Sequence, residues 1–237
     1  MNRSFVIFSK LRNKIQIIYL FSPLNHKYAI LNKEGIMTNK KKNNNDKRIR
    51  ILKAATQVFA QHGFYNSKIS EIAKAANVAD GTIYLYFKNK DDLLISLFEE
   101  EMANIIRKMK DEVAREEGFE NKIRKFIKVH LDLIAENQDL AEVLQIELRQ
   151  SHKFMKEYMG TKLNDYLNII SNIIVQGQKN GEIRSDIIPG IAKRILFGAL
   201  DELSGFWVLS KNKRYSLSLS AQMLGDIFIN GIMIDQK

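Results

Sequence analysis

Apolar side chains recur at helical spacing through most of the chain beyond residue 50, and this period constrains the fold more than any other feature. The first such face consists of Ile51, Leu52, Ala55, Val58 and Phe59. Only two prolines interrupt the 237 residues, which favours long helices. No apolar–polar alternation lasts long enough to predict a strand, and no internal repeat is visible. The sequence therefore predicts an all-α fold.

The same period separates successive helices at polar breaks and glycines. Gly63 is expected to end the first helix, because glycine readily adopts the left-handed conformation that stops one. Ser67 is expected to open a second, short helix as its cap, and residues 80–87 to form a third. Asp91 and Asp92 place acid at the start of a long helix, where the helix dipole favours it. Apolar stripes predict five further helices around residues 123–134, 140–148, 159–174, 187–209 and 216–234.

The charge of the chain is unevenly distributed. The net charge is +10, and residues 1–50 carry all of it, because the remaining residues sum to zero. The part of the chain after residue 50 is therefore not expected to bind a polyanion over its whole surface. The absence of cysteine excludes disulfides, thiolate nucleophiles and cysteine-ligated metals, and it fits a reducing, cytoplasmic environment.

The first residues do not resemble part of a folded domain. Residues 33–35 can be encoded by a purine-rich ribosome-binding sequence just before Met37, so we expect the true start to lie there. Residues 1–45 are expected to be a disordered basic extension, ending in a flexible arm over residues 38–46. The apolar run at residues 15–21 leaves a signal peptide or a membrane tether open, although it is far shorter than the about 20 residues of a membrane helix.

Residues 46–91 carry the pattern that predicts a function. Two short helices joined by a three-residue turn form a helix-turn-helix, whose second helix enters the major groove of DNA. Asn77 stands in the turn, where a residue tolerant of positive φ is needed. Gly81 has no side chain, so its backbone is expected to approach the groove wall. The candidate DNA-binding residues are Ser67, Asp80, Gly81, Thr82, Tyr84, Leu85, Tyr86, Lys88 and Lys90.

These candidates are expected to contact DNA in different ways. The hydroxyl groups of Thr82 and of the two tyrosines stand where phosphates would lie, and Lys90 adds a cation beside helix-terminal N–H groups. Asp80 and Leu85 are candidates for base contacts, and an acceptor such as Asp80 favours a cytosine amino group. A plainer alternative is that Phe87 and the first of the tyrosines form the core of a small three-helix unit.

This segment resembles the DNA-binding domain of the TetR family. The similarity rests on the pattern S/T-x-x-x-x-I-A-x-x-A-x-V-x-x-G-T-I-Y-x-Y-F-x-x-K-x-x-L, whose glycine, tyrosine, phenylalanine and lysine spacings are specific. Two departures are Asn77, where the family usually has glycine, and Ala79, where it usually has serine. The resemblance implies a TetR-type DNA-binding domain at residues 46–91, followed by a helical ligand-binding and dimerisation domain at residues 92–237.

A narrower resemblance involves both domains. Residues 80–98, 145–151, 181–183 and 197–202, with Trp207, look like the fatty-acid-degradation repressors of Gram-positive bacteria called FadR. This implies a dimeric repressor of fatty-acid degradation genes that long-chain acyl-CoA releases from operator DNA. In that group the acyl chain occupies a tunnel between helices, and the CoA phosphates lie near its mouth. No catalytic residue, metal or cofactor other than this effector is expected.

The resemblance points to inward-facing apolar residues as the tunnel wall. The candidates are Met102, Ile106, Phe126, Leu144, Leu148, Phe197, Leu200 and Trp207. Lys108 and Arg149 are candidates for the CoA phosphates, since polyanions need fixed cations. Each has a plainer alternative: the apolar residues as core, Arg149 as the partner of a neighbouring acid, and Trp207 as part of a dimer interface. His130 lies on an apolar stripe and is expected to be a hydrogen-bonded core residue.

The resemblance also implies a homodimer held by the helices at residues 187–209 and 216–234. The small residues expected to allow close approach are Gly198, Ala199, Ser204 and Gly205, and the apolar area is expected from Leu203, Phe206, Leu224, Ile227 and Phe228. The alternatives left open are a TetR-type regulator of efflux that senses a drug or another lipid, and an enzyme acting on acyl-CoA. An enzyme is disfavoured because no Ser-His-Asp set or carboxylate pair appears at recognisable spacing.

Overall fold

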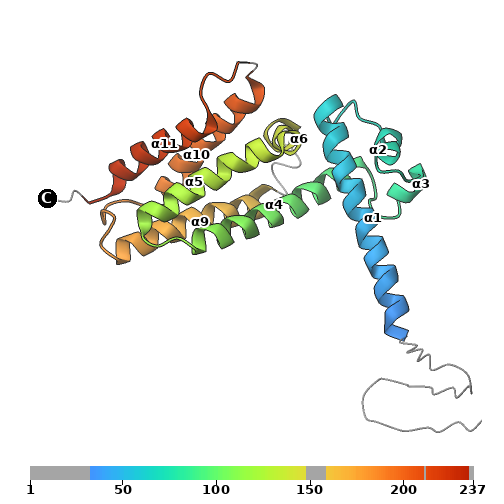
Figure 1. Ribbon diagram of the computed structural model, residues 1–237, viewed down its shortest axis with the longest axis horizontal. Coiled ribbons are helices and arrows are strands. Elements are labelled where there is room, and N and C mark those ends of the chain that lie inside the picture. Colours follow the sequence, from blue (N-terminus) through green and yellow to red (C-terminus); the bar gives the residue numbers. More distant parts are fainter. Residues whose placement is uncertain (1–32, 148–158, 211, 235–237) are drawn as a thin grey trace, which may run out of the picture. The chain divides into compact units, whose positions relative to one another are not determined.

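The computed structural model describes residues 33–147, 159–210 and 212–234, which are almost entirely helical (Figure 1). Its elements are α1 (Lys33–His62), α2 (Ile69–Ala75), α3 (Asp80–Ile83), α4 (Lys90–Ala114), α5 (Phe119–Glu136), α6 (Gln138–Glu142), a π-helical segment η1 (Val143–Glu147), α9 (Met159–Lys179), α10 (Pro189–Leu209) and α11 (Leu217–Ile232). Within these residues, the β-pairing is limited to an isolated bridge between Ile183 and Met233. The prediction of an all-α fold is confirmed.

Helix α1 begins earlier than predicted. It starts at Lys33, so residues 33–45 are helical rather than the disordered arm that the sequence indicated. The segment contains no proline, and extending a formed helix requires no new nucleus, so the helix that forms after residue 50 propagates backward through these residues. Residues up to Arg50 form a separate unit from the rest of the chain. The start at Met37 stays a prediction.

The end of α1 packs with α2 and α3 around a small apolar core. The largest fully buried side chains of this unit are Ile51, Phe59, Ile72, Ile83 and Phe87. Ile51 and Phe59 belong to the face that helical spacing predicted for the first helix. The three helices become rigid because each of them buries one side. The opposite side of each helix is left to face outward.

The two turns of this unit have the backbone geometry that the sequence predicted. Gly63 has φ 74°, and Asn77 has φ 53°, so both adopt the left-handed conformation. Helix α3 ends at Ile83, earlier than predicted, but helical turns continue to Phe87 through a hydrogen bond from its N–H to the Ile83 carbonyl (3.0 Å).

The cap of α2 differs from the prediction. Lys68, not Ser67, is the residue at the cap, and the Glu71 carboxylate accepts a hydrogen bond from the Lys68 N–H (2.9 Å). The Ser67 hydroxyl instead lies 2.6 Å from the Gly63 carbonyl oxygen and 3.2 Å from that of Val58. Ser67 therefore holds the α1–α2 loop against α1, an interaction between segments that local spacing does not reveal.

Helix α4 begins with a reciprocal cap. The Asn89 side-chain oxygen accepts a hydrogen bond from the Asp92 N–H (2.8 Å), and the Asp92 carboxylate accepts one from the Lys88 N–H (2.8 Å). Both interactions satisfy N–H groups at or just before the helix start. The beginning of α4 is thereby fixed directly after the third helical segment.

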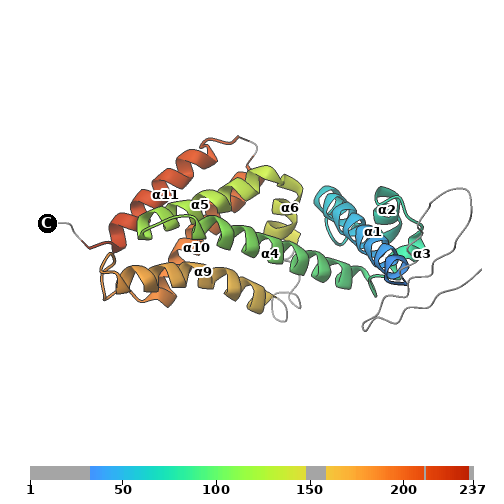
Figure 2. The same ribbon diagram turned by 60° about the horizontal axis from the view of Figure 1, so that its bottom comes forward.

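Helices α4 to α11 form a bundle in which α5 is central. In both views α5 lies between α4 and α11, and it also packs against α9 and α10 (Figures 1 and 2). Its fully buried residues include Ile123, Phe126 and Ile127. The helix predicted around residues 140–148 is divided into α6 and η1, and a π-helical segment of this kind is frequent near functional sites.

Candidate functional site

The outer face of α3 and of the turns after it presents a set of exposed side chains held by a rigid core. Tyr84 is 57% exposed and Leu85 is 81% exposed, whereas Ile83 before them and Phe87 after them are buried. Of the other candidates for DNA contact, Asp80, Gly81 and Lys88 are exposed, and Thr82 and Tyr86 are half-buried at the edge of the face. The buried residues anchor this segment and thereby fix the outward direction of each exposed side chain.

Gly81 lies at an open position on this face. A Cβ atom added there would have no heavy atom of the protein within 4 Å. Its backbone does not adopt the positive φ that makes glycine necessary elsewhere. The fold therefore does not require glycine at this position, and the missing side chain leaves the surface locally flat.

Lys90 and Ser67 are committed to contacts inside the protein. The Lys90 ammonium donates hydrogen bonds to the backbone carbonyls of Phe64 (2.7 Å), Ser67 (3.0 Å) and Tyr65 (3.1 Å), and it lies 4.7 Å from the centre of the Phe64 ring. An ammonium group has three hydrogens, so these carbonyls use all of them. Ser67 is buried. Both residues fix the loop between α1 and α2.

Sequence reasoning missed three exposed residues in the same unit. Tyr65 is 65% exposed, although its neighbour Phe64 is buried. Lys68 and Lys74 are exposed at the start and in the last turn of α2. The available signal was their residue types close to the predicted helix-turn-helix, since hydroxyls and cations are the groups that contact DNA phosphates.

A cavity of about 220 Å³ lies between α4, α5, α6 and η1. Its apolar wall consists of Ile105, Leu133, Ile134, Leu140, Ala141 and Leu144. Its polar lining consists of Glu101, Asn104, Lys108, Glu136 and Asn137. An apolar interior with a few polar groups is the usual character of a site for a small amphiphilic ligand.

The residues predicted to line a tunnel are only partly brought together here. Lys108 and Leu144 line the cavity. Within the described residues, the other predicted lining residues lie outside its wall: Met102, Ile106, Phe126 and Leu200 are buried in the core, and Phe197 and Trp207 are half-buried. The Trp207 ring contacts the Lys213 ammonium, 3.4 Å from its centre. Leu148 and Arg149 lie outside the described residues.

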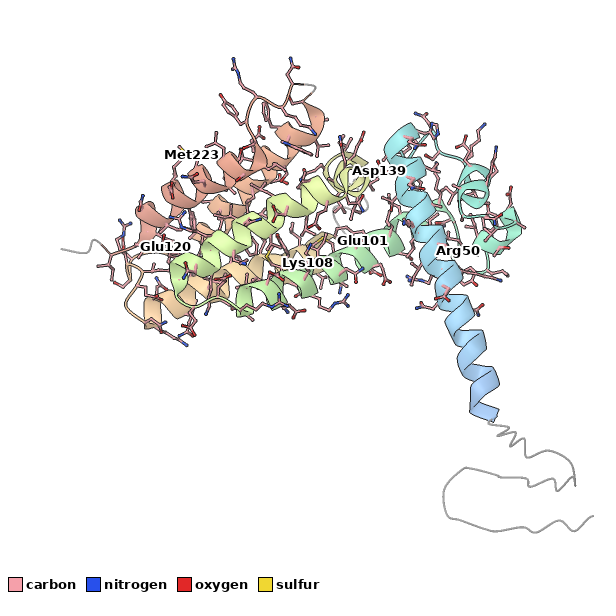
Figure 3. The ribbon with its side chains drawn as sticks, viewed as in Figure 1. Arg50, Glu101, Lys108, Glu120, Asp139 and Met223 are labelled. Carbon is pink, nitrogen blue, oxygen red and sulfur yellow. The ribbon has the colours of Figure 1, made fainter. Side chains whose placement is uncertain are left out.

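Charged groups from two helices meet at the polar side of this cavity. Lys108 of α4 and Glu136 of α5 form an ion pair of 2.7 Å, with 43% and 57% of their side chains exposed. Glu101 lies two turns before Lys108 on α4 (Figure 3). Burial raises the pKa of Glu101 above its ordinary value, and the neighbouring charge of Glu100 raises it further.

A hydrogen-bond chain joins three helices inside the bundle. His130 Nδ1 lies 2.6 Å from the Tyr166 hydroxyl, and Nε2 lies 3.2 Å from Ser204 Oγ. The Ser204 hydroxyl donates to the Leu200 carbonyl (2.7 Å), so Ser204 accepts from Nε2–H and Nδ1 accepts from Tyr166. Burial lowers the pKa of His130 to about 4, against a smaller opposing effect of the Asp201 charge.

This chain confirms His130 as a hydrogen-bonded core residue, although part of its side chain stays accessible. It also corrects the expectation for Ser204, which was predicted to allow close approach in a dimer. Ser204 is fully buried within its own chain, because its hydroxyl bonds to His130 and Leu200. Burial raises the pKa of the Tyr166 hydroxyl far above its usual range, so Tyr166 remains a donor.

An apolar groove of about 470 Å³ runs along α10 and α11. Its lining is almost wholly aliphatic or aromatic and includes Ile191, Ile195 and Ile227. These three side chains are 55%, 62% and 68% exposed. Large exposed apolar patches of this kind mark surfaces that bind a partner.

Two features are absent from the described residues. Within them, none of the helices combines the length and apolar character that crossing a bilayer requires. In the same part of the chain, His, Asp and Glu side chains form no group of three that could hold a metal ion.

Comparison with known proteins matches both halves of the chain. Residues 51–97 match the family model of bacterial regulatory proteins, tetR family, and residues 98–231 match the YsiA-like protein C-terminal region. The fatty acid metabolism regulator protein of Bacillus subtilis is 39% identical over 186 residues, which cover 78% of this chain and 95% of that protein.

Two crystal structures of FadR proteins are similar along the same length. FadR from Bacillus subtilis in complex with stearoyl-CoA has 38% identity and a TM-score of 0.73, covering 78% of this chain and 98% of that one. FadR from Bacillus halodurans has 36% identity and a TM-score of 0.72, covering 77% and 97%.

Proposed function

Because the chain belongs to the TetR family of bacterial regulatory proteins, we propose that it is a dimeric, cytoplasmic repressor of fatty-acid degradation genes that long-chain acyl-CoA releases from operator DNA. The observation that carries the proposal is the similarity, over nearly the whole length of the relative, to a FadR solved with stearoyl-CoA. The exposed face of α3 and the cavity beside α4 are the two sites that such a regulator needs.

The outer face of α3 is the proposed DNA-reading surface. Asp80, Gly81 and Leu85 face the bases, and the tyrosine hydroxyls, Thr82 and Lys88 face the phosphates. The exposure of this face above a packed core supports the assignment, because sequence-specific contacts need side chains held in fixed directions. Lys90 takes a positioning role in place of the phosphate contact predicted for it, and Ser67 takes one in place of a DNA contact, since their polar groups are already bonded within the protein.

The cavity between α4, α5, α6 and η1 is the proposed entrance of the ligand site. Its apolar wall suits the acyl chain near the thioester, and Lys108 suits a phosphate of CoA. Its volume of about 220 Å³ is below the about 300–1,000 Å³ typical of ligand sites, so binding must enlarge it by separating helices. The predicted residues of the adjoining core, such as Met102, Ile106 and Phe126, are the side chains that would line the enlarged space.

The proposed dimer forms through α10 and α11. Burying the exposed isoleucines of the apolar groove against a second copy provides the hydrophobic free energy of association. A two-fold dimer presents two reading helices to half-sites about 34–36 Å apart on a palindrome. The spacing of the two helices then controls affinity for the operator.

Helix α4 provides the proposed connection between ligand and DNA. Its first residue, Lys90, holds the loop of the DNA-binding unit, and its residues Glu101 and Lys108 line the cavity. A helix that moves when the cavity enlarges therefore moves the element to which the reading helix is attached. A coupling free energy of about 1–3 kcal/mol would lower operator affinity about 5- to 150-fold.

The test is an anisotropy titration of the purified protein with its own operator, selected from chromosomal fragments, with and without stearoyl-CoA. Free CoA and a cationic amphiphile serve as controls for the headgroup and for nonspecific detergent action. We expect stearoyl-CoA alone to release the DNA. Unchanged retention of the operator at saturating stearoyl-CoA would refute induction by this ligand.

A further inference from the structure

The Lys108–Glu136 ion pair is the feature of the cavity that its proposed function leaves unexplained. Lys108 belongs to α4 and Glu136 to α5, and both line the cavity. Lys108 is therefore not an unpaired cation in the absence of an anionic ligand. In the free protein its ammonium already contacts a carboxylate at 2.7 Å.

The carboxylate is placed where the helix does not favour it. Glu136 is the last residue of α5, and the carbonyl dipoles at the end of a helix repel negative charge. Glu101 adds a second carboxyl to the same lining, so among the lining residues that the structure describes Lys108 stands with two acids. A ligand phosphate that reaches Lys108 meets the negative charge of Glu136 at close range.

We propose that Glu136 competes with the phosphates of the anionic ligand for Lys108, and thereby sets how tightly the ligand binds. This inference rests on the proposed function. In the free protein Glu136 holds Lys108, and on ligand binding a phosphate takes its place and the carboxylate turns to solvent. Glu136 is thus a specificity-determining residue that weakens binding of every ligand whose anion must displace it, and leaves ligands without such an anion unaffected.

Because the pair is exposed, displacing Glu136 from Lys108 requires little free energy. Ion pairs between exposed side chains contribute about 0–1 kcal/mol to stability, so breaking this one costs the fold little. Removing the Glu136 charge should consequently change ligand affinity without unfolding the protein. The upper half of this range, about 0.5–1 kcal/mol, corresponds to about a 2- to 5-fold change in affinity at low salt.

Helix α5 supplies a matched control. Asp132 forms an ion pair with Lys128 at 2.6 Å, four residues apart on the exposed side of the same helix. Neither residue lines the cavity. Asp132→Asn removes one negative charge and one exposed ion pair, as Glu136→Gln does, but away from the ligand.

The experiment measures the dissociation constant of stearoyl-CoA by calorimetry for the wild-type protein, Glu136→Gln and Asp132→Asn. We expect Glu136→Gln to bind about 2- to 5-fold more tightly at low salt, and this gain to shrink as salt screens the charges. Asp132→Asn should bind as the wild type does. Melting temperatures of the three proteins verify that all are folded.

A second pair of variants separates competition from simple repulsion. If Glu136 acts through Lys108, the gain from Glu136→Gln disappears in a Lys108→Gln background; an equal gain in that background overturns the proposal. Wild-type binding with no difference between Glu136→Gln and Asp132→Asn also overturns it, while leaving the proposed function intact. A wild-type protein that does not bind stearoyl-CoA refutes both.

Discussion

Replacing Gly81 by alanine separates the needs of the fold from those of DNA recognition. The added methyl group has no heavy atom of the protein within 4 Å, so the free protein accommodates it without rearrangement. Glycine-to-alanine changes at compatible helical positions stabilise proteins by about 0.4–1 kcal/mol, because they restrict the unfolded chain. Gly81→Ala should therefore unfold at slightly higher urea concentration than the wild type.

The same methyl group should weaken operator binding. If the backbone at Gly81 approaches the groove wall, the methyl group occupies the space that the DNA needs, and the reading helix must move outward. Losing close contact at even one base pair costs about 1–3 kcal/mol, which corresponds to about a 5- to 150-fold loss of affinity. Higher stability together with weaker DNA binding would distinguish a direct effect on DNA contact from a loss of folded protein.

Gly190→Ala is the matched control for this prediction. Gly190 is the second residue of α10, as Gly81 is of α3, and a Cβ atom there also meets nothing within 4 Å. It should stabilise the protein comparably and leave operator affinity unchanged, with light scattering verifying that the dimer persists. The assays are urea unfolding and fluorescence anisotropy with labelled operator. Wild-type operator affinity for Gly81→Ala would show that the α3 backbone does not approach DNA.

Three further predictions concern other parts of the molecule. Lys90→Met should lower the free energy of unfolding by about 1.5–3 kcal/mol, because the charged hydrogen bonds of Lys90 are lost. Unchanged urea unfolding together with weaker operator binding would instead support a direct phosphate contact. Because the pKa of His130 falls from 6.5 to about 4 on folding, the wild type should lose stability as pH drops from about 6.5 to 4, by at most about 3 kcal/mol. His130→Gln should lack this loss when urea unfolding is measured at pH 7 and pH 4. An equal loss of stability in the wild type and the variant would contradict the prediction. Ile227→Glu should convert the dimer to a monomer in light scattering and abolish operator binding, whereas a persistent dimer would place the interface elsewhere.

The elements of the DNA-binding unit were predictable because their determinants are local. The spacing of Ile51, Val58 and Phe59 indicated the buried face of the first helix, and the structure confirms each of them as core. The turn at Asn77 has the positive φ that its residue type suggested. These features depend on residues within a few turns of one another, so a sequence pattern contains them.

The roles of Ser67 and Lys90 were not predictable in the same way. Lys90 bonds to carbonyls 23 to 26 residues earlier in the chain, and Ser67 bonds to Val58, nine residues earlier. A cation or hydroxyl beside a reading helix resembles a phosphate contact until tertiary packing shows that its hydrogens are already used. The resemblance to a family motif fixed the position of Lys90 but not its role.

The cavity was not predictable from the sequence for a different reason. Helical spacing identifies residues that face inward, such as Phe126 and Ile105, but it does not tell a packed interior from a hollow one. Phe126 is fully buried in the core, whereas Ile105 lines open space, although both lie on apolar stripes of neighbouring helices. Volume depends on how side chains from several helices fit together, and that information is distributed over the whole bundle.

The proposed DNA-reading surface and the proposed ligand site are nevertheless connected by one continuous helix, α4. Lys90 at the start of α4 immobilises the loop that precedes the helix-turn-helix, and Glu101 and Lys108, about three to five turns later, line the cavity of the proposed ligand site. A helix is stiff along its axis, so the end that holds the loop cannot remain still if the cavity side moves. The three carbonyl bonds of Lys90 therefore do more than stabilise a turn, because they join the proposed reading unit to the helix that lines the proposed ligand site.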